Sequence, residues 1–289
     1  MLKRLLFLLC GLALVTQAAA QRSSTALATT LADAYNAWRS AMIRKDAQAW
    51  ASAITNYRQV VTRNEIVSSR KAFPEAVFTG AIEPPDLADM KMLEAEAGGT
   101  TAHLVYFGVA DVEEKSGKNG AVLIKLKFGL EGGVWKFDSN RVTSLENAPT
   151  ELKALESGQK PEFLNAPEFT PPGSFPPTPP LCRVPDFKAG FKLQSFGYET
   201  TLNMNGIDYP PVEHALDQQL IMGGLVRGKN EVTLRLKPAA PAEGQKPSVQ
   251  LRIYKLDAAA PNKPGIEVLR WEAPTSGAPA TITLPIQIE

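Results

Sequence analysis

The chain has 289 residues, of which 44% are hydrophobic and 21% are charged, a composition typical of globular proteins. Its 31 basic and 30 acidic residues leave a formal net charge of +1. This balance excludes the strongly basic surface that binding to nucleic acid or to an anionic membrane requires. The length is sufficient for two domains, each with its own core.

The first twenty residues have the pattern of a secretory signal peptide. Lys3 and Arg4 are basic, Leu5–Val15 is an apolar run, and Ala18–Ala20 supplies the small residues of a cleavage site. The apolar run is too short for a membrane-spanning anchor. We therefore predict that the mature protein begins at Gln21, is extracytoplasmic (periplasmic or secreted), and keeps no transmembrane anchor.

Three helices are predicted in the first part of the mature chain. Apolar residues recur at helical spacing through Leu27–Lys45, which indicates an amphipathic helix. Asp46 is placed to cap a second helix that runs to Ile54. A third periodic stretch, Gln59–Phe73, ends before Pro74.

Strand patterns follow these helices. Apolar and polar residues alternate in Thr101–Val109 and in Ala121–Phe128, as in half-buried strands. Gly132 and Gly133 provide a turn, after which Val134–Asp138 returns as a hairpin partner. Helices followed by antiparallel strands predict an α+β domain.

The rest of the chain divides into a proline-rich stretch and a β-rich stretch. Residues 151–186 contain many prolines with phenylalanines between them, and we predict a spacer without regular secondary structure. Short alternating segments separated by Gly, Pro and Asn turns then predict an all-β sandwich. The predicted organisation is a signal peptide at 1–20, an α+β domain at 21–150, a linker at 151–186 and a sandwich at 187–289.

Parts of the first domain resemble the NTF2-like superfamily. The resemblance rests on a long helix with Tyr35 and Trp38, the turn in Arg44–Trp50 (RKDAQAW) and the hairpin in Leu126–Arg141. It covers Ala26–Leu145 and implies a cone of helices packed on a curved antiparallel sheet, with a pocket between them. The superfamily includes isomerases, dehydratases and non-catalytic binding domains, so the resemblance leaves the function open.

The implied pocket supplies the candidate ligand-binding residues. They are aromatic or polar and lie on the predicted helices and strands: Tyr35, Trp38, Tyr57, His103, Tyr106 and Trp135. Two interpretations remain open, a ligand pocket and a set of core aromatic residues with satisfied polar atoms.

Two classes of function fit these residues. The first is a non-catalytic protein that binds a small molecule, glycan or protein at the cell envelope, because the sequence has no paired acid and base, nucleophile or metal signature. The alternative is an NTF2-like enzyme, of the isomerase or dehydratase type, with His103 as general base oriented by Asp33, Asp46 or Asp138. No catalytic residue is assigned, and we predict no cofactor. Pairing of two copies through the sheet of the first domain is also expected.

Metal and thiol chemistry have little support in the sequence. His103 and His214 are the two histidines, so an all-histidine metal site would lack ligands, and no metal site is predicted. Glu213 and Asp217 near His214 form a weak metal pattern. Cys182 is the one cysteine left after cleavage, either packed as a small apolar residue or paired with another chain.

A third interpretation assigns carbohydrate binding to the predicted sandwich. Its Gly224–Pro238 segment is similar to the turn and strand found in jelly-roll and galactose-binding-like sandwiches. A flat aromatic platform for sugar rings requires aromatic side chains on one face, and the candidates are Tyr198, Tyr209, Tyr254 and Trp271. The alternative is that they form cross-strand packing pairs.

Overall fold

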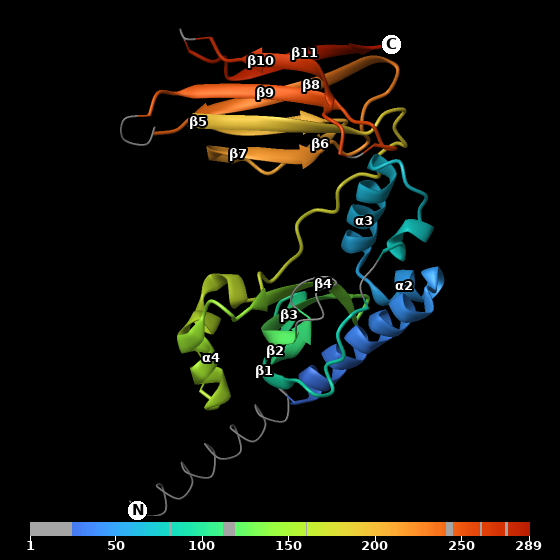
Figure 1. The fold of residues 1–289 in the computed structure, drawn as a ribbon, viewed down its shortest axis with the longest axis vertical. Helices are drawn as coiled ribbons and strands as arrows, with labels where there is room; N and C mark the ends of the chain where they lie inside the picture. The colour runs from blue at the N-terminus through green and yellow to red at the C-terminus, as the bar shows by residue number, and fades with distance from the viewer. Residues whose placement is uncertain are drawn as a thin grey trace, which may run out of the picture. The chain divides into compact units, whose positions relative to one another are not determined.

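A computed structural model describes residues 25–80, 83–111, 119–159, 161–240, 245–260, 262–274 and 277–289. The chain forms two compact units (Figure 1). The first unit consists of the chain up to Gln59 together with Gly80–Thr178, and the second consists of Val60–Thr79 and Pro179–Glu289. The predicted signal peptide lies outside the described residues. In the residues that are described, no helix has the length and apolar character needed to cross a membrane.

The first unit is built on a four-stranded antiparallel sheet whose strands follow chain order. The strands are β1 (Lys91–Gly98), β2 (Thr101–Asp111), β3 (Asn119–Glu131) and β4 (Val134–Ser144). Gly132 and Gly133 both have positive φ, 59° and 82°, and form the turn between β3 and β4. The predicted hairpin is therefore confirmed, and both of its strands are longer than the sequence pattern indicates.

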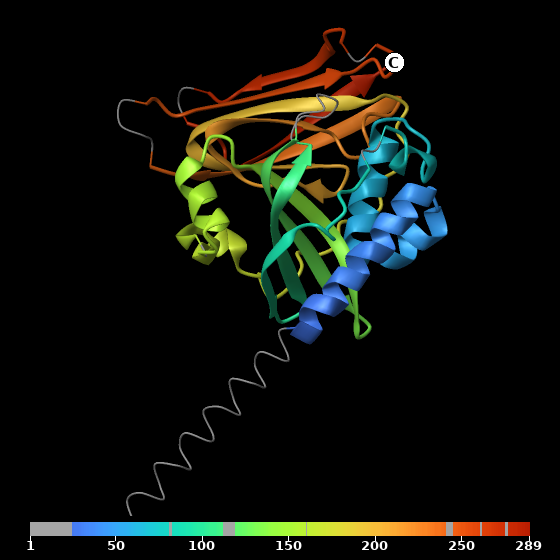
Figure 2. The ribbon, with the colours of Figure 1, turned by 60° about the horizontal axis from the view of Figure 1, so that its bottom comes forward.

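Helices cover one face of this sheet. The first helix, residues 25–44, lies along the sheet (Figure 2), and its Leu31 and Tyr35 are buried in a core with Leu104 and Phe137. The short α2 (Ala47–Ala53) follows, and the Asp46 carboxylate accepts a hydrogen bond from the Ala49 backbone N–H at 2.9 Å, as predicted for its N-cap.

The segment after β4 covers the other face. It contains α4 (Pro149–Glu156) and two single 3₁₀ turns, η2 (Glu162–Asn165) and η3 (Pro167–Phe169). Leu155 and Leu164 pack there against Val105 and Leu123. The prediction that residues 151–186 lack helix is wrong at its start. Pro149 sits in the first turn of α4, where its missing N–H costs nothing, and no proline interrupts the helix.

The third helix, α3 (Asn56–Ser68), contributes most of its length to the second unit. Val67 is buried in the core of that unit. Ser68 Oγ accepts a hydrogen bond from the Gly223 backbone N–H at 2.7 Å. The turn η1 (Glu75–Val77) follows before the chain returns to the first unit.

One antiparallel sheet dominates the second unit. Its strands are β5 (Ala189–Met204), β6 (Ile207–Asp208), β7 (Val212–Leu220), β8 (Gly228–Pro238), β9 (Ser248–Lys255), β10 (Ile266–Glu272) and β11 (Thr281–Ile288). The main path runs β10-β9-β5-β8-β11, with β6 and β7 also paired to β5. The first half of β5 pairs with β9 and the second half with β8, so this 16-residue strand is central and links the β9–β10 part of the sheet to the β8–β11 part.

The predicted fold class, an α+β NTF2-like cone followed by a β-sandwich, is wrong. Of the residues that the structure describes, 43% are in strands and 23% in helices, and these residues combine a four-stranded sheet with a nearly closed, barrel-like antiparallel sheet. The predicted cone is wrong because it places α3 in the first domain, whereas most of α3 belongs to the second unit. The predicted sandwich is wrong because its first two strands, predicted at residues 191–195 and 200–204, are parts of the single strand β5. Alternating burial is the same in a sandwich and in a barrel, so the pattern could not separate them.

Candidate functional site

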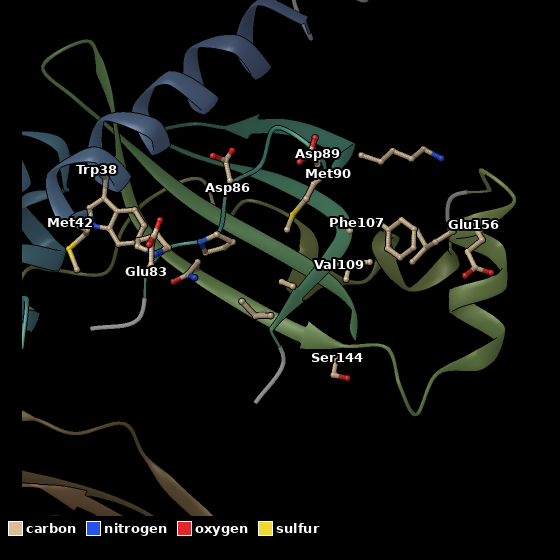
Figure 3. Close-up of a pocket in the computed structure, with 18 of the residues that line it drawn as sticks. Trp38, Met42, Glu83, Asp86, Asp89, Met90, Phe107, Val109, Ser144 and Glu156 are labelled. Atoms are coloured by element: carbon tan, nitrogen blue, oxygen red, sulfur yellow. The ribbon is translucent and has the colours of Figure 1, made fainter. Parts of the chain in front are cut away.

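The first unit contains a cavity of about 1560 Å³, which we call the groove. Its walls come from the first helix, the segment Glu83–Met90, and the ends of β2 and β4, and Glu156 of α4 lies at one end (Figure 3). Apolar side chains that line the groove include Trp38, Met42, Met90, Phe107, Val109 and Val142.

The helix side of the groove is formed by Trp38 and Met42. They are four residues apart, so they lie on the same face of the first helix (Figure 3). The indole of Trp38 stacks on Phe137, with 4.1 Å between the ring centroids, and also contacts Tyr35 at 5.6 Å. Trp38 is therefore fixed by the core on one side and forms part of the groove wall on the other.

The segment Glu83–Met90 is held against the first helix by polar contacts. The Tyr35 hydroxyl donates to the carbonyl of Pro85 at 2.8 Å, and Arg39 Nε donates to the carbonyl of Pro84 at 3.0 Å. Burial raises the pKa of Tyr35 above its ordinary value, so the hydroxyl stays neutral and remains a donor. These two hydrogen bonds therefore attach the segment Glu83–Met90, which forms one edge of the groove, to the first helix.

The charged groups of the groove are mostly acidic. Glu83, Asp86, Asp89 and Glu156 contribute carboxylates, and Lys91 contributes the one ammonium group among the described lining residues. Arg39 approaches Glu83 and Asp86, each at 3.4 Å, and so neutralises part of this charge. Asp89 and Glu156 are exposed. The surface therefore favours positive charge next to apolar contact area.

Of the six candidate binding residues, Trp38 lines the groove. Tyr35 and Tyr106 are buried in the core, where burial raises the pKa of each hydroxyl. Trp135 packs against the same core. Tyr57 lies in the first turn of α3 and stacks on Phe175, with 5.8 Å between ring centroids. The sixth, the imidazole of His103, is buried and lies in register opposite Glu96.

Two of the three residues named as partners for a catalytic His103 have other roles, and the third, Asp33, is exposed on the first helix. Asp46 caps α2. Asp138 accepts a hydrogen bond from Thr55 Oγ1 at 2.8 Å and forms an ion pair with Arg58 at 3.3 Å. The carboxylate beside His103 is that of Glu96, whose Oε2 is 4.0 Å from Nε2.

In the second unit, the aromatic residues do not share one face. Trp271 is in register with Leu251, a buried core residue, whereas Tyr254 is in register with Glu267. Because successive side chains of a strand alternate between faces, Trp271 and Tyr254 point to opposite sides of the sheet. They cannot form one flat platform for a sugar ring.

Cys182 and Tyr209 stabilise the interior of the second unit. Cys182 is buried, and its Sγ lies 3.5 Å from Ser68 Oγ, which agrees with packing as a small apolar residue. Tyr209 is 5% exposed, and its hydroxyl accepts a hydrogen bond from the Met222 backbone N–H at 2.7 Å. Burial raises the pKa of Tyr209 to about 12.

Sequence reasoning missed the acidic edge of the groove. The stretch Glu83–Met90 (EPPDLADM) has neither helical nor strand periodicity, and its signal is only the combination of acidic residues with prolines and apolar side chains. No protein-family model, curated protein or solved structure matches this chain. The resemblance to the NTF2-like superfamily therefore stays a prediction, and the site must be interpreted from its own geometry.

Proposed function

We propose that the mature protein is an extracytoplasmic, non-catalytic binding protein whose groove holds an apolar ligand that carries positive charge. The observation that carries this proposal is the placement of four carboxylates around one cavity with apolar walls. The location rests on the signal-peptide pattern of residues 1–20.

The size of the groove favours an elongated ligand. Sites for drug-sized molecules commonly measure about 300–1,000 Å³, and the groove, at about 1560 Å³, is larger. Met42 of the first helix and Met90 of the segment Glu83–Met90 both line the groove (Figure 3), and their unbranched thioether chains can adapt to irregular apolar surfaces. An extended hydrocarbon chain with a cationic group at one end has the shape and the charge that these walls favour.

The charge contribution to binding is expected to be moderate. An exposed ion pair contributes about 0.2–1 kcal/mol, and salt screens it. Asp89 and Glu156 are both exposed, so together they account for about 0.4–2 kcal/mol, which corresponds to a roughly 2- to 30-fold change in affinity. Contact with Trp38, Met42 and Met90 must supply the rest.

Two probes with the same tail and opposite head groups test the proposal. Titration calorimetry should show that dodecyltrimethylammonium, below its micelle concentration, binds more tightly than dodecyl sulfate. The double variant Asp89→Asn with Glu156→Gln should weaken binding of the cationic probe by roughly 2- to 30-fold. Asp33→Asn removes an exposed carboxylate from the first helix outside the groove and serves as the matched control. Equal binding of both probes, or an equal loss in the control, would contradict the proposal.

A further inference from the structure

Three side chains of metal-ligating type meet on the sheet of the first unit. Glu94 and Glu96 lie on β1 and His103 lies on β2, and one ligand atom from each falls within 4.8 Å of the others. The strand register explains the meeting, because Glu96 is opposite His103 and Glu94 is opposite Val105. Residues two apart on a strand share a face, so all three belong to the face that carries Val105.

We propose that Glu94, Glu96 and His103 bind a divalent transition-metal ion of the Zn²⁺ type. Carboxylate oxygen and imidazole nitrogen are both ligands that Zn²⁺ takes in proteins. Two carboxylates and a neutral imidazole bring a charge that balances a divalent cation. Three protein ligands leave a fourth position of a tetrahedral site for water.

The geometry needs only a small closure around the ion. Metal–ligand bonds of about 2.0–2.2 Å place tetrahedral ligand atoms roughly 3.3–3.5 Å apart. His103 Nε2 and Glu96 Oε2 are 4.0 Å apart, and the largest separation in the cluster is below 4.8 Å. Rotation about the side-chain torsions of the two glutamates covers that difference, while both strands keep their positions.

Burial gives the site a closed side and an open side. The His103 side chain is 2% exposed, so its ring is fixed by its surroundings, whereas the Glu96 side chain is 47% exposed. An ion can therefore enter past Glu96 and be bound by His103 from within. A site on paired strands also holds its ligands more rigidly than a site on a loop.

Lys125 and Lys127 of β3 are lysines on the same face that could compete with a metal for these carboxylates. Lys127 is in register with His103, and Lys125 is in register with Val105 of β2. Lys125 is buried, and its ammonium lies 4.9 Å from the centroid of the Phe169 ring. If Glu94 and Glu96 served only to balance these lysines, the protein would bind no divalent ion at this position. Metal titration separates these two roles directly.

The test uses the mature chain, freed of any affinity tag and treated with a chelator. Titration with Co²⁺, followed by its visible absorbance, and with Zn²⁺, followed by calorimetry, should each show one bound equivalent. Glu96→Gln should weaken binding by more than about tenfold, a loss that even outer-shell changes cause at metal sites. His103→Ala should abolish binding. If His103→Ala does not fold, because His103 is buried, Glu96→Gln still tests the proposal, because Glu96 is half exposed.

His214→Ala is the matched control, because His214 is the other histidine and lies 3.5 Å from the carboxylate of Glu213. It should leave the affinity for both ions unchanged. The proposal would be overturned by the absence of binding in the unmodified chain, by an unchanged affinity in Glu96→Gln, or by a loss in His214→Ala. None of these three outcomes depends on the ligand of the groove.

Discussion

Asn64 of α3 provides a sharp test of how the second unit is stabilised. Its side chain is 2% exposed, its Nδ2 donates to the carbonyl of Pro180, and its Oδ1 accepts from the backbone N–H of Cys182, both at 2.9 Å. Asn64→Ala removes both partners. It leaves the backbone N–H of the buried Cys182 unsatisfied, whereas the carbonyl of Pro180 belongs to an exposed residue and can bind water. One unsatisfied buried group costs about 1–3 kcal/mol, so the free energy of unfolding should fall by about that amount.

The measurement must follow the second unit itself, because a chain of two units need not unfold in one step. Urea unfolding combined with native-state hydrogen exchange of the β5 amides reports the stability of this sheet. Asn203→Ala is the control: its amide bonds Asp208 on the surface of the same unit, and its loss should cost no more than about 0.5 kcal/mol. If the two variants lose the same stability, the docking of α3 does not depend on Asn64 and the reasoning is refuted.

Two further predictions concern the same unit. Because burial raises the pKa of Tyr209 from 10.0 to about 12, its neutral hydroxyl stabilises the fold below pH 10, and this contribution is lost as the pH rises from 10 to 12. Tyr209→Phe should therefore reduce the alkaline loss of stability measured by urea unfolding at several pH values, and an unchanged pH dependence would contradict this. Gly224→Ala would place a Cβ 2.4 Å from the carbonyl oxygen of Phe187 at a φ of 45°. It should destabilise the protein more than Gly206→Ala, which meets open space and costs only about 1–2 kcal/mol for its positive φ; equal melting temperatures would exclude the clash.

The sequence predicted the elements with clear periodicity and missed those fixed by long-range pairing. The helix of residues 25–44, the N-cap at Asp46 and the strands β2 and β3 all lie where the patterns indicate. The strand β1 was missed. Its sequence, KMLEAEAG, consists mainly of residues with high helix propensity, and it is a strand because β2 supplies its hydrogen bonds.

The arrangement of the elements could not be read from local patterns. The periodicity of α3 predicts a helix but not the core against which the helix packs, which depends on Cys182 and Gly223, more than 110 residues further along the chain. The barrel-like closure depends on β5 and on Gly197, where a φ of 70° interrupts one long strand without ending it. A glycine between two alternating segments predicts a turn at least as readily as a bend within a strand.

The same difference between local and long-range signals explains why most residues of the candidate site were not predicted from the sequence. Aromatic residues with a polar atom were the natural candidates for a pocket, yet Tyr35 uses its hydroxyl to hold Pro85, and its ring fills the core. Three of the four carboxylates of the groove come instead from the segment Glu83–Met90, which has no periodicity and is held in place by Tyr35 and Arg39. Tyr35 therefore holds one edge of the groove in place without lining the groove. Tyr35→Phe keeps the ring in the apolar core but removes one hydrogen bond. We expect this variant to loosen the edge that carries Asp86. The residues proposed to bind the ligand and the residues that position them are thus different sets, and in this chain the aromatic pattern identified mainly the second.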